Sequence, residues 1–192
     1  MFSGIIQATG KVNAIELSGS TIRIQVTSPI SAGLHIDQSV SHDGICLTVV
    51  KVENDSHWVE IVKETQSKTT FGGLKQDQLV NLETSLTLNT LLDGHLVQGH
   101  VDTTLKCLET RDEQGSWNMK FNLPSEFANL VISRGSICLN GVSLTVANLF
   151  DDSFEVAIIP YTFHHTNFQQ LRTGDMVNVE FDLIGKYLLR QK

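Results

Sequence analysis

Two short segments of the sequence place the same kind of polar pair between apolar neighbours. Residues 43–49 read DGICLTV, and residues 140–146 read NGVSLTV. Residues two apart in a β-strand share a face, so Cys46 and Thr48 are predicted to point away from the apolar side, as are Ser143 and Thr145. The repeated pair indicates a small-molecule site. The alternative is a strand with a mildly polar face toward solvent.

The cysteine of the first segment is a candidate nucleophile or acid–base group. Its equivalent in the second segment is Ser143, as expected if one site does chemistry and the other only binds. A free thiol with a pKa of about 8.5 is only a few per cent ionised at neutral pH. Cys46 therefore needs a cationic or hydrogen-bonding neighbour to be activated. A small, buried and unreactive thiol is the alternative interpretation.

A third segment, residues 94–101 (GHLVQGHV), carries two histidines. His95 and His100 are five residues apart, which puts them on opposite faces of a strand and about 140° apart on a helix. The two imidazoles therefore do not converge on one ion, and the sequence predicts no metal site.

These segments belong to an internal repeat. Shifting the sequence by 97 positions lays residues 39–83 over residues 136–180 without a gap, and 16 of the 45 aligned positions are identical. Average composition predicts about three identities. Upstream, residues 2–7 match residues 97–102 after a two-residue slip. The sequence therefore predicts two copies of one fold in tandem.

The alignment also shows which polar residues are peculiar to the second copy. His100 stands where the first copy has Ile5, and Asp182 stands where it has Ser85. A histidine titrates near pH 6.5 and suits general acid–base work, although a histidine held by a backbone partner is an equally good interpretation. Asp182 precedes a helical pattern, and the residues alone favour a helix cap for it.

Two threonines persist in both copies. Thr65 and Thr162 are equivalent, and they are stronger candidates than His164 and His165, which match Ser67 and Lys68. We expect the two histidines to lie in a solvated, turn-like segment.

The elements that position these residues are mainly strands. Apolar and polar residues alternate with a period of two, as at 21–26 and 117–121, and turn residues separate such runs. The pattern predicts an all-β protein with an antiparallel barrel or sandwich in each half. We expect closely packed domains at residues 1–87 and 88–182 and a short terminal helix at 183–192.

Composition and charge exclude several classes of protein. The net charge of −7 opposes binding to a nucleic acid, and no apolar run approaches the ~18 residues needed to span a membrane. Three cysteines without C-x-x-C spacing argue against a disulfide framework or a zinc ribbon. We expect a cytoplasmic protein.

The motifs together resemble those of a known family. Residues 1–6, 43–49, 94–102 and 140–146 are similar to the signature segments of riboflavin synthase in its alpha-chain form, and the similarity covers essentially the whole chain. The resemblance implies two six-stranded Greek-key barrels per chain, each binding one 6,7-dimethyl-8-ribityllumazine. It implies a dismutation in which one lumazine passes a four-carbon unit to another. The products are riboflavin and 5-amino-6-ribitylamino-uracil, with no cofactor or metal.

The resemblance also implies a homotrimer. In the family, the productive site forms where the first barrel of one subunit meets the second barrel of the next. The terminal helix expected to hold this trimer is short in our chain.

The resemblance carries site residues over to this sequence. The residues assigned to the chemistry are Ser39, Cys46, His100 and Asp182. Substrate contacts in the first copy are expected at Gly4, Ile5, Ile6, Cys46, Leu47, Thr48, Glu60, Ile61, Val62, Lys63, Glu64 and Thr65. Those in the second copy are expected at Gly99, His100, Val101, Arg134, Ser143, Leu144, Thr145, Ile159, Pro160, Tyr161, Thr162, Phe163 and His164. Each copy is thereby expected to supply the site of its own barrel.

Two other functions compete with this reading. A non-catalytic antenna protein that binds a lumazine or flavin shares the duplicated barrel but tends to lose the second-copy site. Our chain retains Cys46, His100, Ser143 and Thr145 together, which favours the enzyme. A purely structural scaffold for protein partners lacks a supporting exposed apolar segment. The sequence leaves open the path of each proton and an association with lumazine synthase.

Overall fold

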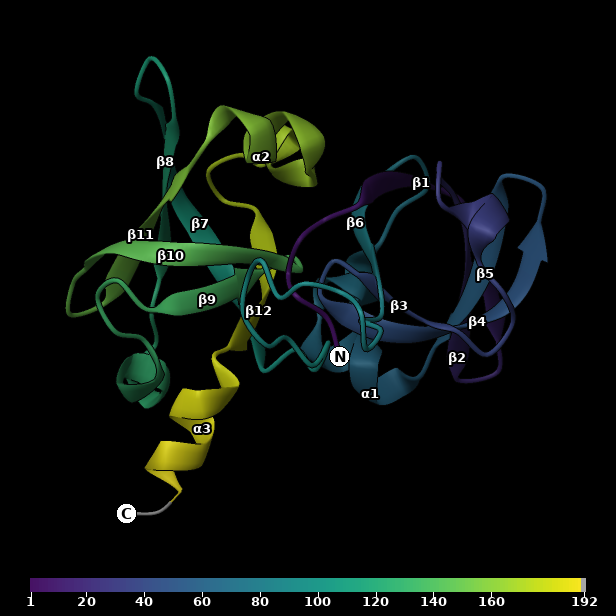
Figure 1. Cartoon of the computed structure of the whole chain (residues 1–192), viewed down its shortest axis with the longest axis horizontal. Helices are drawn as coiled ribbons and strands as arrows, with labels where there is room; N and C mark the ends of the chain where they lie inside the picture. Colours follow the sequence, from purple (N-terminus) through teal and green to yellow (C-terminus); the bar gives the residue numbers. More distant parts are fainter. Residues whose placement is uncertain (191–192) are drawn as a thin grey trace.

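Two closed antiparallel barrels lie side by side in the computed structural model, which describes residues 1–190 (Figure 1). The first barrel consists of β1 (Ala8–Ser18), β2 (Thr21–Thr27), β3 (Ser39–His42), β4 (Ile45–Glu53), β5 (Ser56–Ile61) and β6 (Leu79–Thr84), in the order β1-β2-β5-β4-β3-β6. The second consists of β7 (Thr103–Asp112), β8 (Trp117–Asn122), β9 (Ser136–Leu139), β10 (Val142–Leu149), β11 (Ser153–Ile158) and β12 (Met176–Phe181), joined in the same order. The predicted pair of six-stranded barrels is confirmed. The domain limits stay a prediction.

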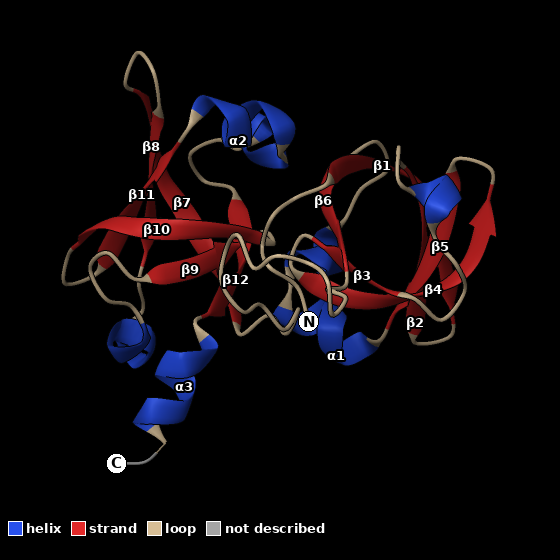
Figure 2. Cartoon of the chain, in the orientation of Figure 1, coloured by secondary structure: helices blue, strands red, loops and turns tan. Residues whose placement is uncertain are grey.

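Short helices lie between the strands, and one more follows the last strand (Figure 2). The α-helices are α1 (Lys63–Lys68), α2 (Pro160–His165) and α3 (Leu183–Leu189). The 3-10 helices are η1 (Ser31–Gly33), η2 (Thr70–Gly73), η3 (Ser125–Leu130) and η4 (Asn167–Gln170). α3 is the expected terminal helix, and residues 191–192 of the expected range lie outside the described residues.

The segment around His164 and His165 is α2 rather than a turn, which corrects the sequence prediction. Both side chains are exposed, as expected, although His165 Nδ1 lies 2.8 Å from the Tyr161 carbonyl oxygen. Pro160 occupies the start of the helix, where its missing N–H is not needed. A helix of six residues is less than two turns long, so no 3.6-residue period can show in its sequence.

Alternation along the strands builds one core inside each barrel. On β4, Ile45, Leu47 and Val49 are buried in the first core, as the period of two predicts. The second core is richer in aromatic side chains and contains Phe121 and Phe154.

A pseudo-symmetric set of amides joins the two barrels. Asn81 on β6 donates through Nδ2 to the carbonyl oxygen of Asn140, and Asn178 on β12 donates through Nδ2 to the carbonyl oxygen of Asp43. These pairs are related by the sequence repeat, since Asn81 matches Asn178 and Asp43 matches Asn140. The duplicated halves therefore face one another through equivalent surfaces.

Two extended segments cross between the barrels. We call residues 2–6 the first arm and residues 97–101 the second arm. The Phe2 N–H donates to the Val97 carbonyl (2.7 Å), and the Val97 N–H donates to the Phe2 carbonyl (3.0 Å). Beyond this contact the arms diverge, so that Ile6 packs against the second core and Val101 packs against the first.

Candidate functional site

The polar residues of β4 lie on the outer face of the first barrel. Cys46 is half-buried and Thr48 is exposed, while their neighbours face the core. Ser39 on β3 is paired directly with Thr48, and directly opposed residues share a face of the sheet. The fold therefore brings Ser39, Cys46 and Thr48 to one surface.

Along one edge of β4, the neighbouring segment changes from β5 to the second arm. Its pairing with β5 begins at Val49 and Val59, and nearer the start of β4 the Cys46 N–H donates to the Gly99 carbonyl instead (2.9 Å). The second arm thus lies along the edge of β4 that β5 has left. Because alternate residues of an antiparallel strand direct their peptide groups to the same edge, the N–H and C=O of Thr48 face this edge too.

Glycine is required where the arm meets β4. Gly99 has φ +82°, and a Cβ at this position would lie 2.5 Å from the Cys46 Cβ. A side chain is therefore excluded by both backbone conformation and space.

A buried carboxylate holds the second arm in place. Glu180 on β12 accepts hydrogen bonds from the main-chain N–H groups of Gln98 (2.7 Å), Gly99 (2.9 Å) and His100 (2.9 Å). Burial raises the pKa of Glu180, and the three N–H groups act in the opposite direction. The arm is fixed by its backbone, while the His100 side chain remains exposed.

The second barrel repeats this arrangement with the first arm. The Ser143 N–H on β10 donates to the Gly4 carbonyl (2.8 Å), and β10 pairs with β11 only from Val146 and Val156 onward. Glu83 on β6 accepts from the N–H groups of Ser3 (2.7 Å) and Gly4 (3.0 Å) and from the Ser3 hydroxyl (2.6 Å).

The assignment of the arms to their own barrels is wrong. Gly4 of the first copy lies against Ser143 of the second barrel, and Gly99 of the second copy lies against Cys46 of the first barrel. Each site is therefore built from one barrel and the arm of the other repeat. Sequence matching identifies equivalent residues, but it carries no information on which barrel an arm contacts.

The second site contains a histidine that sequence reasoning left out. His95 Nδ1 lies 2.7 Å from the Ser143 hydroxyl oxygen, and burial lowers the pKa of His95 against the opposing charge of Asp182. Asp182 Oδ1 also accepts from the Ile184 N–H (3.0 Å) and caps α3, the role that the residues alone favoured. In the sequence, the GHLVQGH segment indicated His95 only as a candidate metal ligand. Its hydrogen-bond partner Ser143 is 48 residues away, so local spacing gave no sign of this contact.

Further predicted contacts lie where β5 and β11 run into short helices. On the first barrel, Ile61 is buried in the core and Glu60 forms an ion pair with Arg23 (2.6 Å). Glu64 forms an ion pair with Lys68 across one turn of α1 (2.8 Å). The remaining residues of this group, Val62, Lys63 and Thr65, lie at the end of β5 and on α1 with exposed or half-buried side chains.

On the second barrel, α2 carries the equivalent group. Phe163 stacks on Trp117 with ring centroids 3.7 Å apart, and His164 contacts Phe163 edge-on. Tyr161 is exposed and stacks on His165. The other members of the group are Ile159, Pro160 and Thr162, of which Thr162 is half-buried. Arg134 is exposed in the turn before β9.

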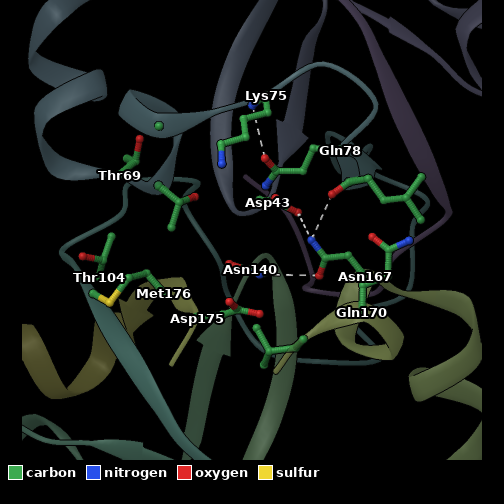
Figure 3. Close-up of a pocket in the computed structure, with 14 residues that line it drawn as sticks. Asp43, Thr69, Lys75, Gln78, Thr104, Asn140, Asn167, Gln170, Asp175 and Met176 are labelled. Carbon is green, nitrogen blue, oxygen red and sulfur yellow. Dashed lines mark hydrogen bonds between the residues drawn. The ribbon is translucent and has the colours of Figure 1, made fainter. Parts of the chain in front are cut away.

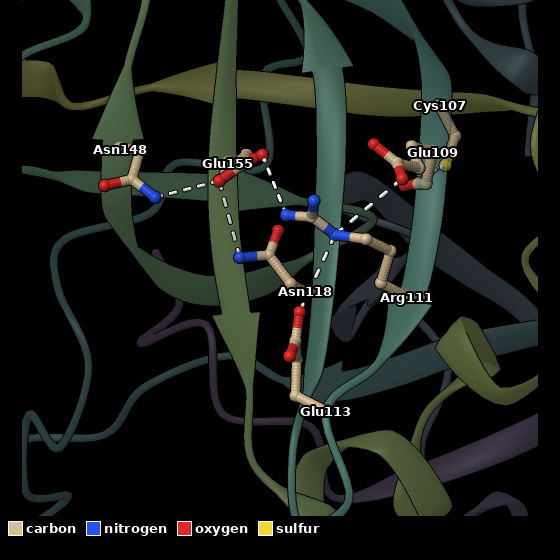
Figure 4. A network of polar contacts seen from close by, with 7 residues as sticks. All are labelled: Cys107, Glu109, Arg111, Glu113, Asn118, Asn148 and Glu155. Carbon is tan, nitrogen blue, oxygen red and sulfur yellow. Dashed lines mark hydrogen bonds and ion pairs between the residues drawn. The ribbon is translucent and has the colours of Figure 1, made fainter.

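Two other polar features lie away from these residues. A groove of about 580 Å³ between the barrels is lined by Asp43, Asn140, Asn167 and eleven further residues, none of them a predicted site residue (Figure 3). On the outer wall of the second barrel, buried Glu155 accepts from Arg111, Asn118 and Asn148 (Figure 4). Within residues 1–190, no group of three His, Cys, Asp or Glu side chains is placed to hold a metal ion.

Comparison with known proteins gives the family. The model of the lumazine binding domain matches residues 3–85 and 98–182, which include most of each arm and each barrel. Riboflavin synthase of Bacillus amyloliquefaciens is 34% identical over 191 residues, covering 99% of this chain and 89% of the relative. Riboflavin synthase of Mycobacterium bovis is 35% identical over 196 residues, covering 99% and 97%. The chain belongs to the riboflavin synthase family.

Solved structures show the same fold. LumP in complex with riboflavin superimposes with a TM-score of 0.88 at 26% identity, covering 94% of this chain and 99% of LumP. LumP in complex with 6,7-dimethyl-8-(1'-D-ribityl) lumazine gives a TM-score of 0.85 at 26% identity, covering 94% and 98%. The family prediction, and with it the prediction of an enzyme, is confirmed. No helix among the described residues is long and apolar enough to cross a membrane.

Proposed function

We propose that this protein is a riboflavin synthase that converts two molecules of 6,7-dimethyl-8-ribityllumazine into riboflavin and 5-amino-6-(D-ribitylamino)uracil. Four carbon atoms pass from the donor lumazine to the acceptor, and the two products together contain all atoms of the two substrates. The reaction therefore needs no oxidant or reductant. Curated relatives named riboflavin synthase, which align along nearly the whole chain, support the proposal.

The observation that carries the proposal is that the chain contains two sites with one framework and different chemistry. Both sites combine an open strand edge with an arm and a buried glutamate, but the first carries Cys46 and His100 and the second carries Ser143 and His95. A dismutation needs the same molecule in two roles, donor and acceptor. Holding both reactants in position contributes roughly 7–11 kcal/mol toward lowering the barrier.

The open strand edges suit the ring of a lumazine. Its pyrimidinedione edge alternates carbonyl and N–H groups, and the main-chain N–H of Thr48, on the edge of β4 beside the second arm, offers a donor to one of its carbonyl groups. Thr145 offers the same on β10. The ribityl hydroxyl groups then lie toward α1 or α2, where Lys63, Thr65 and Thr162 supply polar partners.

The chemistry is assigned to Ser39, Cys46, His100 and Asp182, with His95 as an additional group. The first step is loss of a proton from the acidic C7 methyl group of one lumazine. A nucleophile or water adds at C7 of the other lumazine, and ring joining and cleavage follow. His95 holds the Ser143 hydroxyl on the second-barrel side, while Cys46 and His100 act on the first-barrel side.

Assembly into a trimer completes the proposal. The two half-sites of one reaction come from the first barrel of one subunit and the second barrel of the next, as in the family. The described part of α3 exposes Ile184 (62%), Tyr187 (65%) and Leu188 (60%), an apolar surface that subunit contact would cover. Light scattering should give a mass of three chains, and a monomer would contradict this part. A cytoplasmic location and an association with lumazine synthase stay predictions.

The decisive assay uses purified protein and dimethyl-ribityllumazine alone. We expect one riboflavin for every two lumazines consumed, followed by loss of lumazine absorbance. The likeness to LumP bound to riboflavin supports a second candidate, a non-catalytic binding protein. Tight binding of lumazine without turnover would favour that candidate.

A further inference from the structure

Two buried glutamates hold the two arms. Glu83 on β6 and Glu180 on β12 are equivalent in the repeat, and each side chain belongs to a residue only 2% exposed. Each carboxylate accepts hydrogen bonds from at least two main-chain N–H groups of an arm. In each arm one of these N–H groups belongs to a glycine with positive φ. Neither residue is among the groups assigned to substrate binding or to chemistry.

The contacts of Glu180 lead to the first-barrel site although Glu180 belongs to the second barrel. It holds the N–H groups of the second arm, and Gly99 of that arm accepts the hydrogen bond of the Cys46 N–H. This series of hydrogen bonds thus begins on a strand of the second barrel and ends at the half-buried cysteine of the first barrel. The path consists of two direct hydrogen bonds.

The contacts of Glu83 lead in the opposite direction. Glu83 is paired with Ser41 on β3, and Ser41 is paired with Cys46 on β4, so Glu83 lies in the wall of the first barrel. Its hydrogen bonds nevertheless hold the first arm, and Gly4 of that arm accepts from the Ser143 N–H of the second barrel.

We propose that Glu180 is the positioning residue of the first-barrel site and Glu83 that of the second-barrel site, each acting through the arm it holds. Hydrogen bonds from main-chain N–H groups to a carboxylate are short and about twice as strong as neutral ones. Each glutamate therefore fixes the arm that contacts β4 at Cys46 or β10 at Ser143. The proposal rests on the proposed function only in identifying the ligand of both sites as a lumazine.

Replacement by glutamine separates this role from simple packing. The substitution keeps shape and volume, but it exchanges one acceptor oxygen for an NH2 group that faces N–H donors. In Glu180→Gln, at least one N–H of the second arm loses its acceptor, so the arm leaves β4 more often. Glu83→Gln does the same to the first arm and serves as the matched control.

The test is amide hydrogen exchange of both variants, followed by mass spectrometry of the peptides that contain Cys46 and Ser143. In Glu180→Gln we expect the Cys46 amide to exchange about tenfold faster or more, because its acceptor is Gly99, with Ser143 unchanged within about twofold. In Glu83→Gln we expect the reverse. A crossed pattern of this kind is not produced by general loss of stability.

A second measurement reads the thiol itself. Cys107 and Cys138 are buried, so Cys46 is the accessible cysteine among the three. Alkylation of Cys46 by iodoacetamide should be faster in Glu180→Gln and near the wild-type rate in Glu83→Gln. If a glutamine variant does not fold, Glu180→Asp and Glu83→Asp, which keep the charge but withdraw it from the arm, replace the pair.

The outcomes are distinct. Faster exchange at the site of the glutamate's own barrel, equal effects at both sites, or no effect at either would each overturn the proposal. Exchange and alkylation are measured without substrate, so they do not depend on the proposed reaction. If the wild-type protein forms no riboflavin from lumazine, that result would instead count against the proposed function.

Discussion

The Cys46 N–H donates a hydrogen bond of 2.9 Å to the Gly99 carbonyl oxygen, although the two residues belong to different sequence repeats. The same relationship, with the repeats exchanged, joins Ser143 to Gly4 at 2.8 Å. Neither barrel therefore has a complete site when taken alone. The duplicated halves depend on one another within one chain, before any contact between subunits.

Alanine at position 99 should damage the first-barrel site and the fold together. The new Cβ of Gly99→Ala would lie 2.5 Å from the Cys46 Cβ at φ +82°. Left-handed strain of about 1–3 kcal/mol adds to this clash, and we expect a loss of ~3 kcal/mol or more in the free energy of unfolding by denaturant titration. Gly19→Ala is the control, because Gly19 has φ +62° with nothing within 4 Å. It should cost only the left-handed backbone penalty of about 1–2 kcal/mol; equal losses would contradict the close packing of Gly99.

Serine at position 46 should slow the reaction without abolishing binding. Serine already occupies the equivalent place, Ser143, in the second barrel, so Cys46→Ser keeps the size and the hydrogen-bonding capacity of the side chain. We expect kcat to fall by about tenfold or more, on the scale of a lost acid–base or nucleophilic group, and the Kd for lumazine to change by less than about threefold. Ser143→Cys is the matched exchange. Complete loss of binding in Cys46→Ser would show that its assigned role is wrong.

Alanine at position 100 should reduce turnover more than affinity. The His100 backbone is held by Glu180, but its imidazole is exposed beside the first-barrel site, so truncation leaves the arm in place. We expect kcat to drop by ~100-fold, the usual scale for loss of general acid–base catalysis, with a much smaller change in Kd. His35→Ala, an exposed histidine outside the site, is the control. An unchanged kcat would remove His100 from the mechanism.

The first barrel should be more sensitive to acid than the second. His42 Nε2 and His57 Nε2 lie 2.8 Å apart in its buried interior, and burial lowers the pKa of His42 to about 3 and that of His57 to about 4. Between these values and 6.5, the unfolded chain binds more protons than the folded one, so stability falls as the pH drops. At about 1.4 kcal/mol per pKa unit, we expect each of the two histidines to contribute a loss of about 3 kcal/mol between pH 7 and pH 4.

The second barrel supplies the control for this prediction. Its equivalents of His42 and His57 are Leu139 and Phe154, both fully buried. In the double variant His42→Leu/His57→Phe, the denaturation midpoint should therefore fall less steeply as the pH is lowered. The measurement is the denaturation midpoint at a series of pH values. An unchanged slope would mean that groups other than these two histidines govern acid unfolding.

Local pattern was enough to predict the strands and the faces of β4 and β10. Their period of two follows from the alternation of side chains across a sheet, and the burial of Ile45, Leu47 and Val49 agrees with it. The helices α1 and α2 were missed because six residues carry too little periodicity. His95 was missed as a partner of Ser143 because a hydrogen bond between residues 48 positions apart leaves no trace in local spacing.

The amino-acid sequence by itself determined that the chain is a duplication, that each half folds as an antiparallel β-structure, and that polar residues at positions 46, 48, 143 and 145 face outward. These properties depend on local periodicity and on similarity between the halves. Only the tertiary structure decided which barrel each arm serves, because that depends on how two similar surfaces pack across their pseudo-symmetry axis. Two arms of equivalent sequence can lie on their own barrels or exchange. The hydrogen bonds of Glu83 and Glu180, which join residues about 80 positions apart, hold the exchanged arrangement.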